Sequence, residues 1–387
     1  MRITIVVCGR FWAFDLAQEL SKKNFLHALI TSYPKFKLKN YIIPSNKIHS
    51  IYFKEIVERV LLKLNLIRIF KNSYYYINFF FDFFASKIVE YKKSDIIIGW
   101  AGACKTTFLK SNKFNHCIKI LERGSSHIQF QNDILLEEHN LLGLKTWCIS
   151  NKLIRREIEE YSLADYIFVP STFAKNSFIK LGVDKKKLIQ IPYGVNLNEF
   201  KPGKKNDNVF RIISVGTVSV RKGNIYLLKA FSELNLKNSE LIFVGPIDYE
   251  MNRIIKPYLS NIKIKFLGKK PQQDLRKFYT NSSIFVINSI EDGFAMVIAQ
   301  AMACGLPVIC TKNCGGADII DNNKNGFICN IRDVEQLKEK ILFFYQNKKQ
   351  HLKFSKFAQT KSKKFLSWEN YGRKIIKKYK LIREMHR

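Results

Sequence analysis

The stretch SIEDGFAMVIAQAMACGLPVI, residues 289–309, follows the short apolar run Ile284–Ile287 and forms the most informative pattern in the chain. The apolar run predicts a strand, the acidic residues with Gly293 predict a loop, and the apolar spacing predicts a helix that begins near Phe294. Pro307 then opens the next strand. Free backbone N–H groups at such a helix start can bind a phosphate or a hydroxyl group. The same residues also fit an ordinary strand–helix–strand unit with capped ends.

Apolar, strand-like runs alternate with segments of helical periodicity along the chain, such as Asn224–Leu234 and Met296–Ala303. The predicted strands are Ile3–Val7, Asp95–Gly99, Ile118–Leu121, Tyr166–Val169, Arg211–Val215, Leu241–Val244, Ile262–Leu267, Ile284–Ile287 and Pro307–Cys310. This alternation predicts an α/β fold with parallel, doubly wound sheets. Ligands of such folds bind beyond the carboxyl ends of the strands, so the loops that follow strands are the candidate site.

The alternation breaks at Asn196–Asn208, where NLNEFKPGKKNDN has the proline, glycine and asparagine content of a linker. At 387 residues the chain also exceeds the size at which one core usually keeps growing. We therefore expect an N-terminal domain over residues 1–200, a second domain over residues 208–360, and a C-terminal helix over residues 361–387 that packs back on the first domain. The two domains would face each other across a cleft, with the linker between them.

The formal net charge of +33 admits three interpretations. These are nucleic-acid binding, attraction to anionic lipid, and a lysine-rich composition without a specific partner. The basic residues are spread along the chain, with denser regions at Lys35–Lys71, where aromatic residues are interleaved, and from Lys338 to the C-terminus. No common nucleic-acid-binding motif is present, so a nucleic-acid-binding protein is the weaker alternative.

The cysteine spacing and the apolar runs favour a cytoplasmic protein, soluble or peripheral to a membrane. Eight cysteines are scattered without paired C-x-x-C motifs, which argues against structural zinc and favours buried free thiols in a reducing compartment. The N-terminal run MRITIVVCG is too short for a signal peptide. The aromatic stretch Tyr74–Val89 is interrupted by polar residues and is shorter than the roughly 20 residues of a spanning helix.

A second loop of interest, VGTVSVRKG at residues 215–223, follows the predicted strand Arg211–Val215. Gly216 permits a tight turn, and Arg221 and Lys222 place positive charge just before a predicted helix. Charge-assisted hydrogen bonds of this kind suit a diphosphate. A solvated basic turn is the alternative interpretation.

Taken together, these segments resemble the donor-binding domain of the family 4 retaining glycosyltransferases, the group 1 glycosyl transferases. That resemblance implies the GT-B fold, in which two Rossmann-like domains face a cleft. It extends over nearly the whole chain through further segments, namely GRFWAFDLAQEL, LERGSSHIQFQNDIL, ADYIFVPSTFAK, IPYGVNLNEFKP and FLSWENY. The N-terminal domain would then face the acceptor and the C-terminal domain would bind a nucleotide-sugar donor.

The resemblance also implies roles for residues of the C-terminal domain. Lys222 matches the family lysine that neutralises the donor diphosphate, while Thr217 stands at the position of the family arginine, whose role Arg221 would take over. Asp292 aligns with the first glutamate of the family's paired glutamates, with Glu291 as the alternative. The remaining donor-binding candidates are Gly216, the loop residues Gly293, Phe294 and Ala295, the ribose-binding Gln300 and, for the base, Lys269.

In the N-terminal domain the resemblance implies four further site residues. Gly9 lies in the glycine loop after the first strand, and Ser171 follows the strand Tyr166–Val169. His127 matches the family histidine that approaches the donor sugar, and Arg123 is a second candidate in the same segment. His127, Asp292 and Lys222 are the predicted catalytic residues.

The expected activity is transfer of a hexose-type sugar from a nucleoside-diphosphate sugar to a hydroxyl group, with retention, in cell-surface polysaccharide or lipopolysaccharide synthesis. We expect no cofactor, and no metal because the chain lacks a D-x-D motif. The acceptor would be a carbohydrate or a lipid-linked molecule, and the basic aromatic stretch Lys35–Val89 would suit the anionic inner leaflet of the plasma membrane. A GT-B relative acting as sugar hydrolase, phosphorylase or epimerase is an alternative. A nicotinamide-dependent oxidoreductase is disfavoured because no G-x-G-x-x-G follows the first strand.

Overall fold

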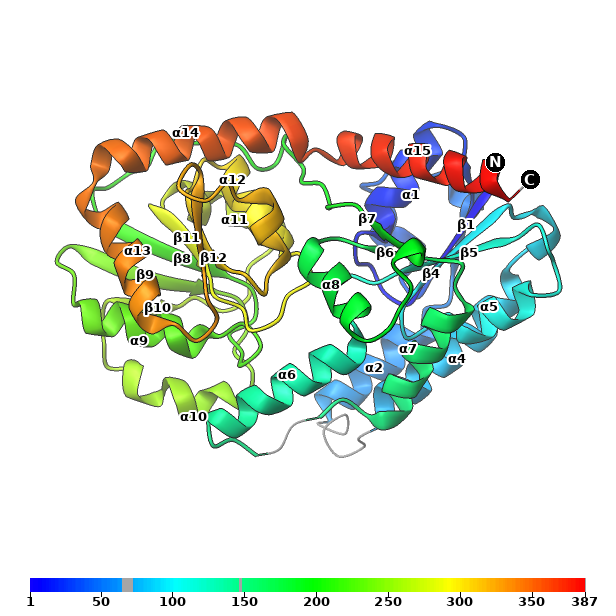
Figure 1. Cartoon of the computed structure of the whole chain (residues 1–387), viewed down its shortest axis with the longest axis horizontal. Coiled ribbons are helices and arrows are strands. Elements are labelled where there is room, and N and C mark those ends of the chain that lie inside the picture. Colours follow the sequence, from blue (N-terminus) through cyan, green and yellow to red (C-terminus); the bar gives the residue numbers. More distant parts are fainter. Residues whose placement is uncertain (65–71, 146–147, 387) are drawn as a thin grey trace.

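The computed structural model describes residues 1–64, 72–145 and 148–386 and contains two parallel β-sheets flanked by helices (Figure 1). The 7-stranded sheet has the order β3-β2-β1-β4-β5-β6-β7, and the 6-stranded sheet has the order β10-β9-β8-β11-β12-β13. Both orders reverse direction at a central pair of strands, β1 with β4 and β8 with β11, as in doubly wound folds. The predicted α/β architecture with two such domains is confirmed.

The strands of the first sheet are β1 (Ile3–Val7), β2 (Leu26–Thr31), β3 (Ile48–Ser50), β4 (Ile96–Trp100), β5 (Ile118–Glu122), β6 (Tyr166–Val169) and β7 (Leu188–Gln190). Those of the second are β8 (Phe210–Val215), β9 (Ser239–Val244), β10 (Ile264–Phe266), β11 (Ile284–Ile287), β12 (Val308–Thr311) and β13 (Gly326–Cys329). Central strands such as β1 and β11 are buried along their whole length, which explains their continuous apolar runs.

The helices of the first half are α1 (Ala13–Lys22), α2 (Phe53–Lys63), α4 (Ser73–Ile88), α5 (Lys105–Ser111), α6 (Ile128–Leu141), α7 (Asn151–Leu163) and α8 (Thr172–Lys180). Those of the second half are α9 (Asn224–Leu234), α10 (Met251–Ile255), α11 (Gln272–Thr280), α12 (Met296–Ala303), α13 (Val334–Gln346), α14 (Lys348–Phe365) and α15 (Trp368–Met385). The basic stretch beginning at Lys35 lies partly outside the described residues, because residues 65–71, including Lys71, fall in a gap.

Every predicted run forms a strand, but the described residues contain four further strands that periodicity does not reveal: β2, β3, β7 and β13. Two of them, β3 and β7, have three residues and lie at the edges of their sheet, where little apolar surface is needed. The helix expected near Phe294 begins at Met296 instead, because Ala295 adopts a left-handed conformation with φ of 53°.

The C-terminal helices connect the two halves of the molecule (Figure 1). Helix α14 packs on α12 in the second half, and α15 crosses to the first half and packs on α1. The predicted limit at residue 361 therefore falls inside α14, which continues to Phe365. Gly372 permits this close packing because it has no side chain. A Cβ at this position would lie only 2.8 Å from the Cβ of Glu19. Beside this crossing, the amide of Val195 donates to the carbonyl of Leu366 at 2.6 Å.

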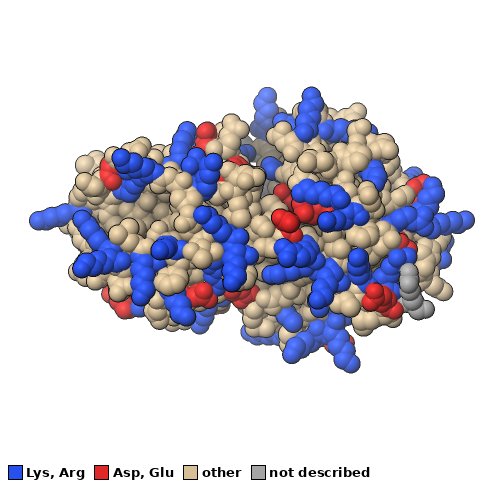
Figure 2. Space-filling model, turned by 90° about the horizontal axis from the view of Figure 1, so that it is seen from above, with Lys and Arg blue, Asp and Glu red and all other residues tan. Residues whose placement is uncertain are grey.

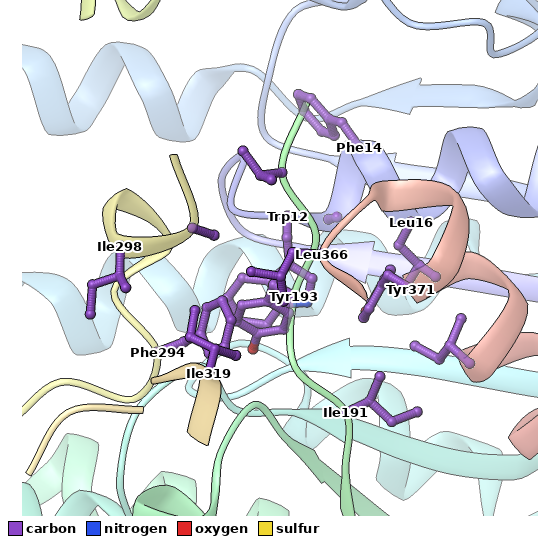
Figure 3. Packing of buried hydrophobic residues seen from close by; sticks show 14 of the residues in the cluster. Trp12, Phe14, Leu16, Ile191, Tyr193, Phe294, Ile298, Ile319, Leu366 and Tyr371 are labelled. Carbon is purple, nitrogen blue, oxygen red and sulfur yellow. The ribbon is translucent and has the colours of Figure 1, made fainter. Parts of the chain in front are cut away.

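One hydrophobic cluster continues from the first sheet into the second (Figure 3). Its centre is the ring of Tyr193, which stacks on Trp12 at 4.2 Å and meets Phe294 edge-on at 5.3 Å between ring centroids. Trp12 belongs to the first half and Phe294 to the loop between β11 and α12 of the second, so burial of these rings stabilises the contact between the halves.

The eight cysteines are free thiols, and only Cys148 is not buried. Within the described residues, none of the helices combines the length and the apolar character required to cross a lipid bilayer.

Candidate functional site

A large cavity of about 1270 Å³ lies between the two halves, where the carboxyl ends of the sheets' strands face each other. The first half contributes the loop after β1 and helix α1, and the second contributes the loop after β8, the loop between β11 and α12, and the start of α12. The lining includes Arg10, Trp12, Asp15, Lys37, Tyr41, Gly124, Tyr193, Gly216, Lys222, Gln272, Asp292, Phe294, Ala295, Met296, Val297, Gln300 and Glu369.

Lys222 and Asp292 meet at the wall of this cavity as an ion pair. The other oxygen of Asp292, Oδ1, accepts hydrogen bonds from the amides of Phe294 at 3.2 Å and Ala295 at 3.0 Å. The carboxylate therefore occupies the two loop amides that sequence reasoning assigned to the donor. Lys222 remains about one-fifth exposed toward the cavity.

The first amides of α12 remain directed toward an external ligand. Met296 and Val297 line the cavity, and within the described part of the chain their amide groups have no hydrogen-bond acceptor. A helix start with free N–H groups next to the Lys222 ammonium attracts anions. Sequence reasoning assigned the donor to the amides of Gly293, Phe294 and Ala295, which precede these two, because the left-handed conformation of Ala295 is not visible in the motif.

Arg221 does not line the cavity, although it precedes Lys222 directly. Its Nε donates to Glu291 at 2.7 Å and its Nη2 donates to the Ser125 hydroxyl at 3.0 Å. The guanidinium is thus already bound to a buried carboxylate, and Lys222 is the cation of this loop that reaches the cavity.

Glu291 extends from the loop between β11 and α12 into the first half of the molecule and is fully buried. Its Oε1 accepts from the hydroxyls of Ser125 and Ser126, each at 2.7 Å, and from the Ser126 amide at 3.0 Å, while its Oε2 accepts from Gln131 at 2.9 Å. Burial alone would raise the pKa of Glu291, but Arg221 and the serine hydrogen bonds outweigh burial and lower this pKa to about 2. A charged Glu291 therefore joins the two halves next to Asp292.

His127 lies behind this contact and does not line the cavity. It is the N-cap of α6, its Nδ1 accepts from the Gln129 amide at 3.1 Å, and its ring packs against Tyr161 and Phe178. Burial, followed by the positive charge of Arg123, lowers the pKa of His127 to about 4. The imidazole is therefore neutral at neutral pH, with its proton on Nε2.

Arg123 and Ser171 also lie outside the cavity lining, and both support the contact between the halves. Arg123 is hydrogen-bonded to Gln131 at 2.9 Å, which in turn donates to Glu291. Ser171 caps α8 and donates its hydroxyl to the carbonyl of Gly293 at 2.6 Å. Position 293 accepts only glycine, because the Cβ of any larger residue would overlap the carbonyl oxygen of Gly124.

The remaining predicted residues divide into two groups. Gly216 and Gln300 line the cavity, and Gln300 accepts from the Tyr279 hydroxyl at 3.1 Å, which leaves its amide nitrogen to donate. Gly9 lies just before the lining residues Arg10 and Trp12. Lys269 is exposed and outside the lining, whereas Gln272 on α11 lies inside it.

Three residues of the site lie in segments that carry the resemblance, but sequence reasoning gave them no role, because tertiary packing places them at the cavity. Trp12 and Tyr193 form an aromatic wall, and Asp15 on α1 lines the cavity from the first half. Burial raises the pKa of Asp15 to about 7, against the lowering effect of Arg10. Asp15 can therefore exchange a proton near neutral pH.

This geometry defines the class of fold. The chain superposes on a sucrose-phosphate synthase from Thermosynechococcus elongatus with a TM-score of 0.71 and 16% identity, over 99% of both chains. It superposes on HepE from Anabaena, solved in complex with UDP and glucose, with a TM-score of 0.70 and 16% identity, over 98% of this chain and 99% of HepE. The fold is GT-B, with two Rossmann-like domains.

The sequence match is narrower than the fold match. Residues 196–361 match the family described as glycosyl transferases group 1. An uncharacterized glycosyltransferase of Methanocaldococcus jannaschii is 30% identical over 243 residues, 62% of this chain and 66% of the relative. A probable sucrose-phosphate synthase of Thermosipho melanesiensis is 29% identical over 53% of this chain and 50% of the relative, and an O-antigen chain mannosyltransferase B of Escherichia coli is 28% identical over 43% and 45%. The matched part thus spans about half to two thirds of the curated relatives.

Proposed function

We propose that the chain transfers a hexose-type sugar from a nucleoside-diphosphate sugar to a hydroxyl group of an acceptor bound in the 1270 Å³ cavity. The observation that carries this proposal is the position of Lys222 beside the free amides of α12, at a cavity shared by both halves. The group 1 match over residues 196–361 and the UDP and glucose bound by HepE support a nucleotide-sugar donor.

In this proposal the diphosphate binds at Lys222 and the start of α12, close to the glycine turn at Gly216. The ribose hydroxyls contact Gln300, whose amide nitrogen donates while its oxygen accepts from Tyr279. Binding requires Asp292 to share Lys222 with the diphosphate. Lys222 and the α12 amides then stabilise the negative charge that develops on the leaving diphosphate.

The sugar would lie against the donor loop, between Asp292 and the aromatic wall of Trp12 and Tyr193. Arg221, Glu291 and Arg123 act indirectly in this proposal, since they hold the donor loop on the first half. His127 is a positioning residue here, because its buried ring orders the start of α6. Retention fits a front-face attack in which the departing diphosphate guides the acceptor hydroxyl.

We further propose that the chain acts at the inner face of the plasma membrane, in synthesis of a cell-surface polysaccharide or lipopolysaccharide. The O-antigen mannosyltransferase among the relatives supports such a pathway. Helices α2 and α4 present a contiguous apolar face, joined by the ring contact of Phe53 with Phe84 at 5.4 Å. Its exposed members are Ile56, Val57, Val60, Leu62, Tyr74, Tyr76, Phe79, Phe80, Phe83 and Phe84. Exposed patches of this extent mark interaction surfaces.

The test combines nucleotide binding with two lysine variants. Thermal-shift and calorimetric titrations with UDP, GDP, ADP and CDP, and with their common sugars, should show stabilisation by one nucleotide family. Lys222→Ala should weaken this binding and lower turnover roughly 10²-fold, the usual effect of removing one preorganised charge contact. Lys229→Ala is the matched control, because Lys229 is an exposed lysine on the adjacent helix α9.

Three outcomes would contradict the proposal. Equal nucleotide binding in both variants would remove Lys222 from the donor site. Sugar release that does not depend on any acceptor would identify a hydrolase. Stabilisation by a short DNA duplex without any nucleotide response would favour nucleic-acid binding.

A further inference from the structure

A second groove, of about 610 Å³, lies beside the exposed face of α2, and its volume is within the roughly 300–1,000 Å³ of small-molecule sites. Its walls are mainly apolar and include Phe36, Tyr52 and Ile56, whose side chains are all more than half exposed. The donor-binding residues described above do not line it.

The rim of this groove carries a net positive charge. Lys35, Lys37 and Arg59 line it, and in the described residues none of the three has an ion-pair partner. Among the described lining residues Glu55 is the one carboxylate; it accepts a hydrogen bond from Ser32 and pairs at 3.1 Å with Lys54, which also pairs with Glu58. An apolar groove in which three cations face one carboxylate is complementary to an amphipathic anion.

The groove adjoins the main cavity at Lys37, which lines both. Next to Lys37, the main cavity is lined by Tyr41, whose hydroxyl accepts from Arg10 at 2.9 Å. An anionic group held at Lys37 would therefore have its apolar part in the groove and its other substituent in the cavity, on the side facing α1.

From this adjacency we propose that the groove binds the hydrocarbon chain of a long-chain phosphate ester, with the phosphate at Lys37 and with Lys35 and Arg59 alongside. Naming this lipid as the carrier of the acceptor sugar rests on the proposed function. The binding site itself does not, because it is defined by the groove, its cations and its position next to the cavity.

The experiment measures calorimetric binding of butyl, octyl and dodecyl phosphate, each below its micelle concentration, with inorganic phosphate as the probe without a chain. Affinity should rise with chain length, up to roughly fourfold per added methylene where the methylene is fully buried. Ile56→Asp should abolish this dependence on chain length. Lys37→Gln should weaken all the esters by a similar factor and preserve the dependence.

Matched controls separate the groove from general surface properties. Val60→Asp changes an equally exposed apolar residue of α2 outside the groove, and Lys39→Gln changes a nearby exposed lysine outside both cavities. Both should bind the esters as the unmodified chain does. Thermal unfolding of each variant verifies that it is folded.

Two results would overturn the inference: affinity independent of chain length, or equal losses in Ile56→Asp and Val60→Asp. UDP binding measured on the same samples distinguishes the two proposals. Intact UDP binding without ester binding would reject only the groove, whereas ester binding without any nucleotide binding would reject only the transferase.

Discussion

Glu122 and Glu291 are both fully buried carboxyl groups, and their surroundings shift their pKa values in opposite directions. Glu291 has a guanidinium and several donors around it, and its pKa is lowered to about 2. Glu122, at the end of β5, has one donor, the Trp12 Nε1 at 3.1 Å, and burial raises its pKa to about 8 despite this hydrogen bond. At neutral pH Glu291 is a carboxylate that holds the halves together, and Glu122 is a neutral acid beneath the aromatic wall.

The raised pKa of Glu122 makes stability depend on pH. The folded state keeps the proton up to about pH 8, while the unfolded chain releases it near pH 4.5, so stability should fall as pH rises between these values. Glu122→Gln should reduce the fall, on the order of 3–5 kcal/mol if Glu122 alone contributes. Urea unfolding at pH 5 and pH 8 measures it. The exposed Glu384→Gln is the control, and an unchanged pH dependence in Glu122→Gln would refute the assignment.

Asp15 leads to a prediction about activity. Since its pKa is raised to about 7, it is ready to accept a proton from the acceptor hydroxyl only above that pH. The kcat/KM of the unmodified chain should therefore decline below pH 7, and Asp15→Asn should lower activity and remove this decline. Glu369→Gln, which changes another carboxylate of the cavity lining, should keep the profile. Retention of the acid limb in Asp15→Asn would exclude Asp15 as its origin.

The residues that motifs could identify are those whose function depends on neighbours in sequence. Lys222 and Asp292 belong to loops between a strand and a helix, and the order of elements alone brings such loops to one edge of a sheet. The position of Arg221 could not be predicted from its neighbours in sequence. Its guanidinium binds Glu291 and points away from the cavity, and this orientation depends on a hydrogen bond to Ser125 in the other half of the molecule. The positions of Asp15 and Tyr193 at the cavity could not be predicted from the sequence for the same reason.

At the scale of elements, α6 is the helix that connects the two halves most directly, since it begins at the Glu291 contact and ends against the second half (Figure 1). Near its C-terminal end, Glu138 accepts from the Tyr226 hydroxyl and from Arg332 Nε, both at 2.6 Å. Its role as a bridge depends on Arg332, almost two hundred positions away in the sequence, so sequence patterns do not reveal it. Short edge strands such as β3 were missed because three residues carry too little pattern.

Two adjacent glutamates of α6 provide a matched comparison of buried and exposed ion pairs. Both Glu137 and Glu138 pair with Arg332, but the Glu138 side chain is 0% exposed and that of Glu137 is 57% exposed. Glu138→Gln should destabilise the protein by about 2 kcal/mol, because it replaces the buried carboxylate that accepts from Tyr226 and Arg332 with a neutral amide. Glu137→Gln should change stability by less than about 1 kcal/mol. Urea midpoints compare them, and equal effects would show that burial does not govern this contact.

At the scale of the whole molecule, the excess of 65 basic over 32 acidic residues is distributed over the surface. Figure 2 shows Lys and Arg side chains spread across the face above the C-terminal helices, without a single continuous stripe. A spread of this kind gives long-range attraction to any anionic surface, whereas the aromatic face of α2 and α4 gives a local apolar contact. Charge alone could not distinguish these contributions in the sequence.

The two contributions should separate in a vesicle experiment. Binding to vesicles that contain anionic phosphatidylserine should weaken strongly from 0.1 to 1 M NaCl, because the screening length shortens from about 10 to 3 Å. The binding that remains at 1 M NaCl, the remainder, should come from the apolar contact. Phe80→Glu, at an exposed position of α4, should abolish the remainder, while Leu352→Glu on α14 should retain it. Equal binding to neutral and anionic vesicles, or no effect of Phe80→Glu, would argue against the proposed membrane face.

The packing of α15 on α1 has a consequence for folding during synthesis of the chain. Strand β1 and helix α1 are synthesised long before the residues of α15 that cover α1, among them Tyr371, Ile375 and Tyr379. The second sheet and its helices lie between α1 and α15 in the chain, so that half can complete its core before α15 is made. The first half keeps an apolar surface uncovered until α15 is made, and chains truncated before residue 368 should be the ones that chaperones retain.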